Sequence, residues 1–207
     1  QAIVVEQIGA FVLRDVPRPR PPADELLLKV LVTGLCRTDL KLIRQGHRDL
    51  LLPRIPGEEV VGEVVGPVPP DSPVQPGQAV FVHPGRWCGQ CSACRRGAEN
   101  LCRAMRIMGF HRDGGFAEFV AAPRQSLIPL PPELPADRAV FAEPLACCLN
   151  ALELGRCGVA DAVGIWGAGT AGQLLARAAR ALGAASVRLI EPDPNRRQQA
   201  DILAQPG

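Results

Sequence analysis

Hydrophobic and polar residues follow one another in short runs over the first 150 residues, and proline and glycine bound these runs. Such runs predict β-strands, and they span residues 2–5, 11–16, 25–33, 60–65, 79–82 and 116–121. The run Leu26–Val32 is apolar except for Lys29, which predicts a strand buried over most of both faces. Many short strands separated by turns predict a partly open barrel.

The pattern changes after about residue 137. Helical apolar spacing is found at 137–154, 173–182 and 195–203, and short apolar runs at 162–166 and 186–190. From residue 162 onward, the order strand, helix, strand, helix predicts the first half of a parallel, doubly wound sheet. We therefore expect an α/β protein with a β-rich domain over residues 1–150 and a partial dinucleotide-binding domain over residues 151–207.

Composition narrows the class of protein. The chain has 207 residues, of which 47% are hydrophobic and 21% charged, which excludes a disordered chain. A net charge of +2 argues against a nucleic-acid binder. No apolar run approaches the roughly 20 residues of a membrane helix, and no charged segment with an apolar core opens the chain. A cytoplasmic protein is the expectation.

Four of the eight cysteines are clustered with the spacing Cys88-x2-Cys91-x2-Cys94-x7-Cys102. Without an export signal, clustered cysteines indicate metal binding before disulfides. Four sulfur ligands complete the tetrahedral coordination of a zinc ion and leave no coordination position for water or substrate, so the predicted site is structural. A bacterial iron–sulfur cluster needs a different last spacing and a proline after the fourth cysteine, where Arg103 stands here. Four unrelated buried thiols are the remaining alternative.

A glycine-rich segment, Gly167-Ala-Gly-Thr-Ala-Gly172, lies between a predicted strand and a predicted helix. This context is typical of a dinucleotide-binding loop. Gly167 allows the tight turn, Gly169 lets the backbone approach a pyrophosphate, and Gly172 allows close packing of helix on strand. Thr170 and Ala171 belong to the same predicted cofactor-binding loop. A glycine-rich turn without a ligand is the alternative.

Glu191 ends the next predicted strand. A carboxylate there accepts hydrogen bonds from the adenosine ribose and repels a 2′-phosphate, which favours NAD over NADP. Arg196 and Arg197 follow closely, and an arginine nearby is what pairs with the phosphate of NADP. NADP therefore stays open as the second choice.

Four further residues are candidate ligands or catalytic groups, although no spacing rule connects them. Cys36 lies in Gly34-Leu-Cys-Arg-Thr-Asp39, Glu58 and Glu59 follow Pro56-Gly57, and Glu143 precedes Pro144. Taken one at a time, each carboxylate is expected at the surface and the thiol in the protein core.

These motifs, in this order, resemble the zinc-containing medium-chain alcohol dehydrogenases, especially the branch of sorbitol, iditol and threonine dehydrogenases. The resemblance runs along the whole chain, and the chain looks like a family member that lacks its C-terminal part. It rests on the four-cysteine cluster, the glycine-rich loop and four motifs: Gly34–Asp39, Pro56–Gly62, Asp113–Phe119 and Ala142–Leu145. The resemblance implies a GroES-like barrel followed by a nucleotide-binding domain, with the active site between them.

The resemblance also implies roles for individual residues. Cys36 and Glu143 look like ligands of a catalytic zinc, and Cys147 falls where the simple alcohol dehydrogenases supply a cysteine ligand. Thr38 looks like the hydroxyl that takes the proton of the substrate alcohol. The implied reaction is NAD-linked oxidation of a secondary alcohol or polyol, or its reverse, in a homodimer or homotetramer.

Two residues depart from the family pattern. Glu58 stands where the family has a zinc-binding histidine. A zinc site made of Cys36, Glu58 and Glu143 would therefore carry one negative charge more than the same site with a histidine in place of Glu58. Lys41 stands where many members have a proton-relay histidine, and His111 is a further candidate near the predicted cleft. The alternatives are a zinc-free reductase of the same family and an NAD-binding protein that has lost catalysis.

Overall fold

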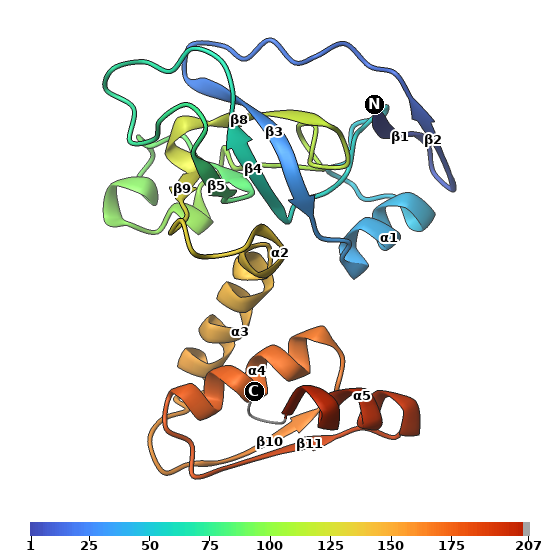
Figure 1. Cartoon of the computed structure of the whole chain (residues 1–207), viewed down its shortest axis with the longest axis vertical. Coiled ribbons are helices and arrows are strands. Elements are labelled where there is room, and N and C mark those ends of the chain that lie inside the picture. The colour runs from blue at the N-terminus through green and yellow to red at the C-terminus, as the bar shows by residue number, and fades with distance from the viewer. Residues whose placement is uncertain (205–207) are drawn as a thin grey trace. The chain divides into compact units, whose positions relative to one another are not determined.

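The computed structural model describes the backbone of residues 1–204 and the side chains of residues 1–200. A five-stranded antiparallel sheet, in the order β8-β3-β4-β5-β9, forms the centre of the N-terminal part (Figure 1). Its strands are β3 (Glu25–Thr33), β4 (Val60–Val64), β5 (Ala79–Val82), β8 (Phe119–Pro123) and β9 (Leu127–Pro129). The sheet curls into a half-barrel, which confirms the partly open barrel predicted from the sequence.

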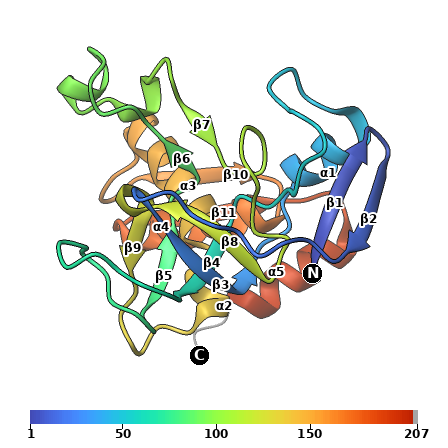
Figure 2. The same ribbon diagram turned by 90° about the horizontal axis from the view of Figure 1, so that it is seen from above.

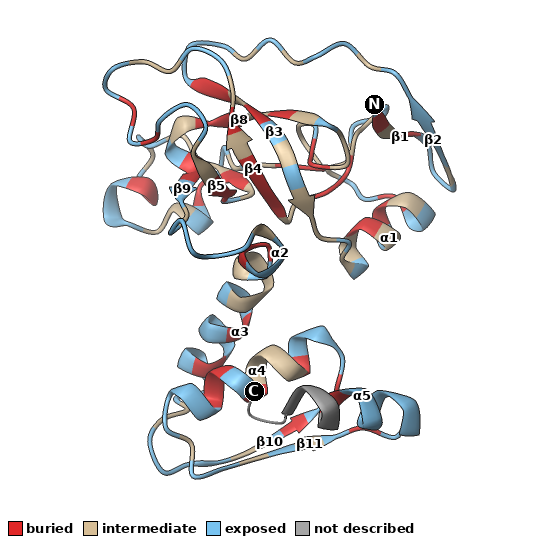
Figure 3. Ribbon diagram, in the orientation of Figure 1, coloured by how far each residue is buried: buried red, intermediate tan, exposed pale blue. Residues whose placement is uncertain are grey.

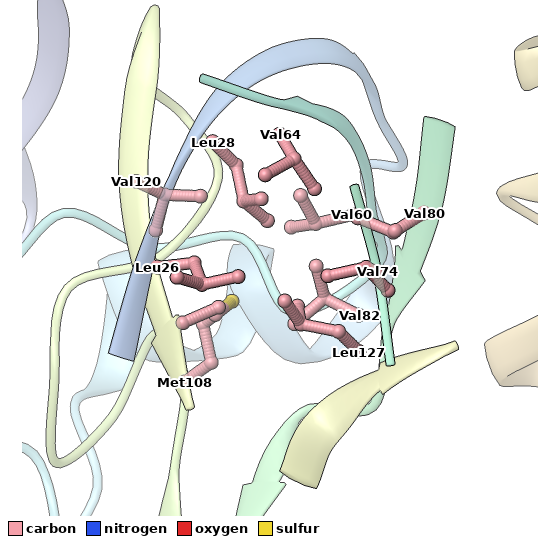
Figure 4. Close-up of a cluster of buried hydrophobic side chains, with 11 residues drawn as sticks. Leu26, Leu28, Val60, Val64, Val74, Val80, Val82, Met108, Val120 and Leu127 are labelled. Carbon is pink, nitrogen blue, oxygen red and sulfur yellow. The ribbon is translucent and has the colours of Figure 1, made fainter. Parts of the chain in front are cut away.

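The hydrophobic core lies on the inner face of this sheet (Figure 4). Its buried members come from β3, β4, β5, β8, β9 and two connecting loops: Leu26, Leu28, Val60, Val64, Val74, Val80, Val82, Met108, Val120, Ala122 and Leu127. Small β-branched and aliphatic side chains dominate because they pack closely on a curved, pleated surface.

The prediction that β3 is buried over most of both faces is wrong. Leu26 and Leu28 are buried, whereas Lys29 is exposed and Leu31 is 42% exposed. An antiparallel sheet of a half-barrel turns one face to the core and the other to solvent. A continuous apolar run therefore does not by itself show that both faces are covered.

Two smaller strand pairs flank the main sheet. β1 (Ala2–Gln7) and β2 (Ala10–Arg14) form an antiparallel hairpin. β6 (Gly85–Arg86) pairs with β7 (Arg106–Ile107), and between them a long loop projects away from the sheet (green in Figure 2). This loop contains the 3-10 turns η1 (Cys94–Arg96) and η2 (Glu99–Leu101), and η3 (Arg124–Ser126) precedes β9. Elements this short carry no detectable periodicity.

Helix α1 (Arg37–Gln45) has no counterpart in the sequence prediction. It begins directly after Cys36, carries Asp39 in its first turn and ends before Gly46. An acidic residue in the first turn and a glycine after the last one are typical helix boundaries. Leu42 is buried and the opposite side is polar and exposed, as the colours of Figure 3 show.

The single helix predicted over 137–154 is two helices, α2 (Ala136–Ala139) and α3 (Ala142–Leu154). Pro144 explains the interruption, because proline is tolerated in the first turn of a helix but not in its interior. The chain divides into two compact units between Phe141 and Ala142, so that residue 150 lies inside α3.

The second unit has the order predicted from the sequence. β10 (Ala162–Trp166) and β11 (Ser186–Ile190) are parallel neighbours, and α4 (Thr170–Ala181) and α5 (Pro194–Ala204) lie on the same side of them (Figure 1). Leu152 of α3 packs on Ala178 and Ala179 of α4. None of the helices in the described part of the chain has the length and apolar character needed to cross a membrane.

Candidate functional site

The four clustered cysteines come together in the loop between β6 and β7. Their Sγ atoms all lie within 4.8 Å of one another. The separations of the hydrogen-bonded pairs are 3.5 Å for Cys91–Cys94, 3.6 Å for Cys88–Cys102 and 4.0 Å for Cys88–Cys94. A tetrahedral zinc with ordinary Zn–S bonds separates its sulfurs by about 3.8 Å. The four side chains therefore fit a zinc ion without rearrangement.

Hydrogen bonds prepare this cluster for a cation. Backbone N–H groups of Cys91 and Cys88 donate to the sulfurs of Cys88 and Cys102, each at 3.4 Å. A backbone N–H bond from Cys94 lowers the pKa of the Cys91 thiol to about 6, whereas burial raises the pKa of Cys94 to about 12. Near neutral pH, Cys91 therefore favours the thiolate form, whereas Cys94 keeps a proton that a metal would displace on binding.

A second pair of donor atoms lies at the N-terminus of α1. Sγ of Cys36 is 3.5 Å from Oε1 of Glu58, although 21 residues separate them in the chain. A tetrahedral zinc with one sulfur and one oxygen ligand separates them by about 3.6 Å. Burial, together with the charges of Asp39 and Glu58, raises the pKa of the Cys36 thiol to about 12. Thr38 also hydrogen-bonds the Cys36 side chain.

Asp39 holds the two segments of this site together. Its Oδ2 accepts the N–H of Cys36 and its Oδ1 accepts the N–H of Gly57, each at 3.0 Å. The side chain is buried, and burial raises its pKa above the usual value. One carboxylate therefore joins the start of α1 to the turn that precedes Glu58.

The other candidates from the sequence lie in different surroundings. Lys41 is exposed on α1. Nδ1 of His111 accepts the N–H of Ile107, which anchors the ring in its own turn. Glu143 and Cys147 lie in α3, in the second unit, where Glu143 is half-buried and Cys147 exposed.

The glycine-rich loop of the second unit has a strand-turn-helix geometry. Gly167 has φ +98°, a left-handed conformation that favours glycine. A Cβ on Gly172 would collide with the carbonyl oxygen of Gly167, whereas the space around Gly169 is open. Gly169 caps α4, so the N–H groups of Thr170 and Ala171 begin the first turn of the helix. Such an N-terminus is a favourable position for a phosphate.

Glu191 lies beside this loop at the end of β11. Its Oε2 accepts the N–H of Ala168 at 2.9 Å and its Oε1 accepts the N–H of Asp193 at 3.1 Å. These hydrogen bonds lower the pKa of the carboxyl group, so it is ionised near neutral pH. The guanidinium of Arg197 donates to the backbone oxygens of Glu191 and Pro192, while the Arg196 side chain is exposed.

Comparison with known proteins places this arrangement in a family. The model of the alcohol dehydrogenase GroES-like domain matches residues 22–132, more than half of the chain. The chain belongs to the zinc-type medium-chain alcohol dehydrogenases. It is 34% identical over 199 residues to D-altritol 5-dehydrogenase of Agrobacterium fabrum, covering 94% of this chain and 59% of the relative.

Two further relatives of this alcohol dehydrogenase chain support the assignment. L-threonine 3-dehydrogenase of Pyrococcus horikoshii is 37% identical over 189 residues, covering 90% of this chain and 53% of the relative. The crystal structure of a zinc-binding dehydrogenase from Sinorhizobium meliloti bound to NADP has a TM-score of 0.90 and 37% identity. It covers 97% of this chain and 58% of that one. The chain thus spans little more than half the length of these relatives.

Contacts within the first unit explain why distant motifs of this dehydrogenase occur together. The N–H groups of Gly114, Gly115 and Phe116 donate to the carbonyls of Ile55, Gly57 and Pro56. A Cβ on Gly114 would collide with two of these carbonyl oxygens. The Gly114-Gly115 turn therefore holds the segment that precedes Glu58 through backbone hydrogen bonds. No spacing in the sequence reveals this contact between the two segments.

Gly34 has a similar role beside Glu59. Its N–H donates to the carbonyl of Glu59 at 2.8 Å, and a Cβ at this position would collide with Oε2 of Glu59. Glu59 thus folds back over the strand end that leads to Cys36. Sequence reasoning included Glu59 as a candidate but did not identify the glycine that makes room for it.

Proposed function

We propose that the intact protein is a zinc-dependent oxidoreductase that transfers a hydride between a secondary alcohol or polyol and NAD. The observation that carries this proposal is the convergence of Cys36 and Glu58, at a separation that suits two ligands of one zinc ion, within an alcohol dehydrogenase GroES-like domain. The relatives named D-altritol and L-threonine dehydrogenase agree with an alcohol as the reacting group.

Each residue has a role in the proposed reaction. Cys36 and Glu58 would hold the metal, and the family resemblance implies Glu143, or Cys147 as the alternative, as a further ligand. The hydroxyl of Thr38 would accept a hydrogen bond from the substrate hydroxyl and pass the proton on to water. A zinc ion held there would supply Lewis acidity toward the alcohol oxygen, and a bound nicotinamide would supply the hydride acceptor. Asp39 keeps the Cys36 and Glu58 segments in place through two backbone hydrogen bonds.

The cofactor lies, in this proposal, at the glycine-rich loop. The N-terminus of α4 binds the pyrophosphate, and Gly169 leaves room for its approach. Glu191 is ionised and directly follows β11, where it would accept a hydrogen bond from a ribose hydroxyl and repel a 2′-phosphate. Arg197 is engaged with backbone carbonyls. These features favour NAD, and Arg196 is the residue that would allow NADP. The four-cysteine cluster binds a second zinc that is structural.

A substrate screen tests the proposal. The intact, zinc-loaded protein is mixed with NAD or NADP and a panel of secondary alcohols and polyols, and reduced nicotinamide is followed by its absorbance. We expect turnover with NAD and a polyol, its loss in Cys36→Ser, and its retention in Cys157→Ser, a matched change outside the site. Tight cofactor binding without hydride transfer from any alcohol would contradict the proposal.

A further inference from the structure

A cavity of about 770 Å³ lies in the first unit, where the loop that holds the four cysteines joins the main sheet. Its volume is in the range of small-molecule sites, roughly 300–1,000 Å³. The charged residues that line it are four arginines and two carboxylates: Arg86, Arg106, Arg112, Arg124, Asp24 and Glu25. The cavity shares no lining residue with the Cys36–Glu58 pair or with the glycine-rich loop.

The two carboxylates of the cavity are both occupied by arginines. Oε1 of Glu25 lies 3.0 Å from Nη1 of Arg86, and its Oε2 lies 2.7 Å from Nη2 of Arg112. Asp24 makes a second contact with Arg86 at 2.6 Å. The two carboxylates thus balance the charge of two guanidinium groups, and the lining offers no carboxylate to the other two.

Arg106 and Arg124 supply this excess of positive charge. Nη1 of Arg106 donates to the carbonyl of Met105, and the arginine forms no ion pair with any residue in the described part of the chain. Arg124 pairs with Asp71 at 2.8 Å, but Asp71 does not line the cavity and its side chain is 74% exposed. An exposed ion pair is screened by water, so the cavity keeps a positive potential.

The pairing of β6 with β7 concentrates this charge. Arg86 lies directly opposite Arg106 in the two-stranded ribbon (Figure 2). Residues opposite each other project from the same face, and like charges in such a pair are destabilising. Asp24 and Glu25 take only two of the five N–H donors of Arg86. An anion between the two guanidinium groups would therefore relieve their repulsion and find free donors.

Further donors surround the same cavity. Nη2 of Arg112 donates to Glu25 and to the carbonyl of Ala121, whereas its Nε and Nη1 are buried without a hydrogen-bond partner among the described residues. Unpaired buried donors are rare in proteins, and an ion or an ordered water usually satisfies them. Nδ1 of His111 accepts the N–H of Ile107, so the neutral ring carries its proton on Nε2.

We propose that this cavity binds a phosphorylated small molecule, whose phosphate lies between Arg86 and Arg106. A guanidinium forms paired hydrogen bonds with the oxygens of a phosphate, and a dianion matches the excess of two positive charges in the lining. Trp87 and Pro123 line the same cavity and offer apolar surface to the group that the phosphate esterifies. The site goes beyond the proposed dehydrogenase function, because none of these residues takes part in hydride transfer.

Equilibrium dialysis tests the proposal. The intact protein is dialysed against radiolabelled inorganic phosphate at constant ionic strength. We expect saturable binding that Arg106→Gln weakens about tenfold or more, the loss expected for one charge-assisted hydrogen bond. Arg103→Gln removes the same charge at an exposed position that does not line the cavity, and should bind as the wild type does. Circular dichroism establishes that both variants are folded.

Competition identifies the form of the phosphate. Glycerol 3-phosphate should displace the label from the wild type, whereas glycerol should not. A lack of saturable binding, or an equal effect of the two arginine variants, would overturn the proposed site. Displacement by inorganic phosphate but not by glycerol 3-phosphate would overturn the phosphorylated small molecule as its ligand. No outcome depends on turnover, so a failure of the dehydrogenase activity is recognised separately in the substrate screen.

Discussion

At the scale of single residues, buried carboxylates position the candidate sites. Asp39 and Glu191 each accept two backbone N–H groups from segments that are not regular in structure. A carboxylate suits this task because it offers several acceptor positions and no donor when it is ionised. The sites thus depend on side chains that do not themselves have to touch the substrate.

Replacing Asp39 by asparagine should destabilise the first unit. The amide keeps one acceptor oxygen but turns its NH₂ group toward the second backbone N–H, which leaves a buried donor unpaired. We expect a loss of about 1–3 kcal/mol in the free energy of unfolding, measured with urea. Asp137→Asn, in the exposed first turn of α2, is the control and should cost about 0.3 kcal/mol. Equal effects of the two changes would contradict the role given to Asp39.

Glu191 should make stability depend on acid pH. Backbone hydrogen bonds lower the pKa of its carboxyl group in the folded state below 4.5, the ordinary value for a glutamate side chain. Its contribution is therefore complete above the unfolded pKa and is lost as the pH falls through the folded pKa. Glu191→Gln should be less stable than the wild type at pH ~7, with a difference that shrinks below pH ~4. The unfolding free energies of both proteins are measured with urea across this pH range. A difference between them that does not change with pH would contradict the lowered pKa of Glu191.

At the scale of elements, the strand-turn-helix of β10, the glycine-rich loop and α4 is fixed by close backbone approach. A Cβ on Gly172 has no room beside the carbonyl of Gly167, whereas one on Gly169 meets no atom within 4 Å. The two glycines therefore serve different purposes, the first for packing and the second for the space that a cofactor needs.

This difference predicts different outcomes for two alanine variants. Gly→Ala in an exposed helix is normally stabilising, but Gly172→Ala should cost about 1–3 kcal/mol of unfolding free energy, because α4 has to move away from the loop. Gly169→Ala should cost less than about 1 kcal/mol and weaken binding of NAD. Urea unfolding and a titration with NADH distinguish the two. A Gly172→Ala protein as stable as the wild type would be inconsistent with the packing described.

The four-cysteine loop is an element without a core of its own. Leu101 is 65% exposed, and none of the cysteines belongs to the hydrophobic cluster of the main sheet. Chelation strong enough to remove its zinc should therefore unfold this loop alone, because metal binding supplies its folding free energy. Limited proteolysis should then cut within residues 88–105 and leave the sheet intact. Resistance of this segment after complete metal removal would contradict the prediction.

Periodicity predicted some elements well and others not at all. The bounds of β3, β5, β10 and β11 agree with the alternation or apolar runs, because these strands are bounded by prolines, glycines or polar turns. Helix α1 was missed because nine residues between turns give a weak signal. The association of Cys36 with Glu58 depends on Asp39 and on the Gly114-Gly115 turn, and no local pattern encodes such long-range contacts.

At the scale of the whole molecule, the chain combines two units with separate tasks. The first contains the four-cysteine cluster and the Cys36–Glu58 pair, and the second contains the glycine-rich loop with Glu191. Family membership is carried by the first unit, which the GroES-like domain model matches. The proposed chemistry needs both units, since metal ligands and cofactor come from different parts of the chain.

Anomalous X-ray diffraction across the zinc absorption edge tests this account most directly. We predict a strong zinc peak among Cys88, Cys91, Cys94 and Cys102 in crystals of the intact protein. A second peak should lie beside Cys36 and Glu58. A lack of any zinc peak at the four cysteines, or a metal bound elsewhere and none beside Cys36, would contradict the account.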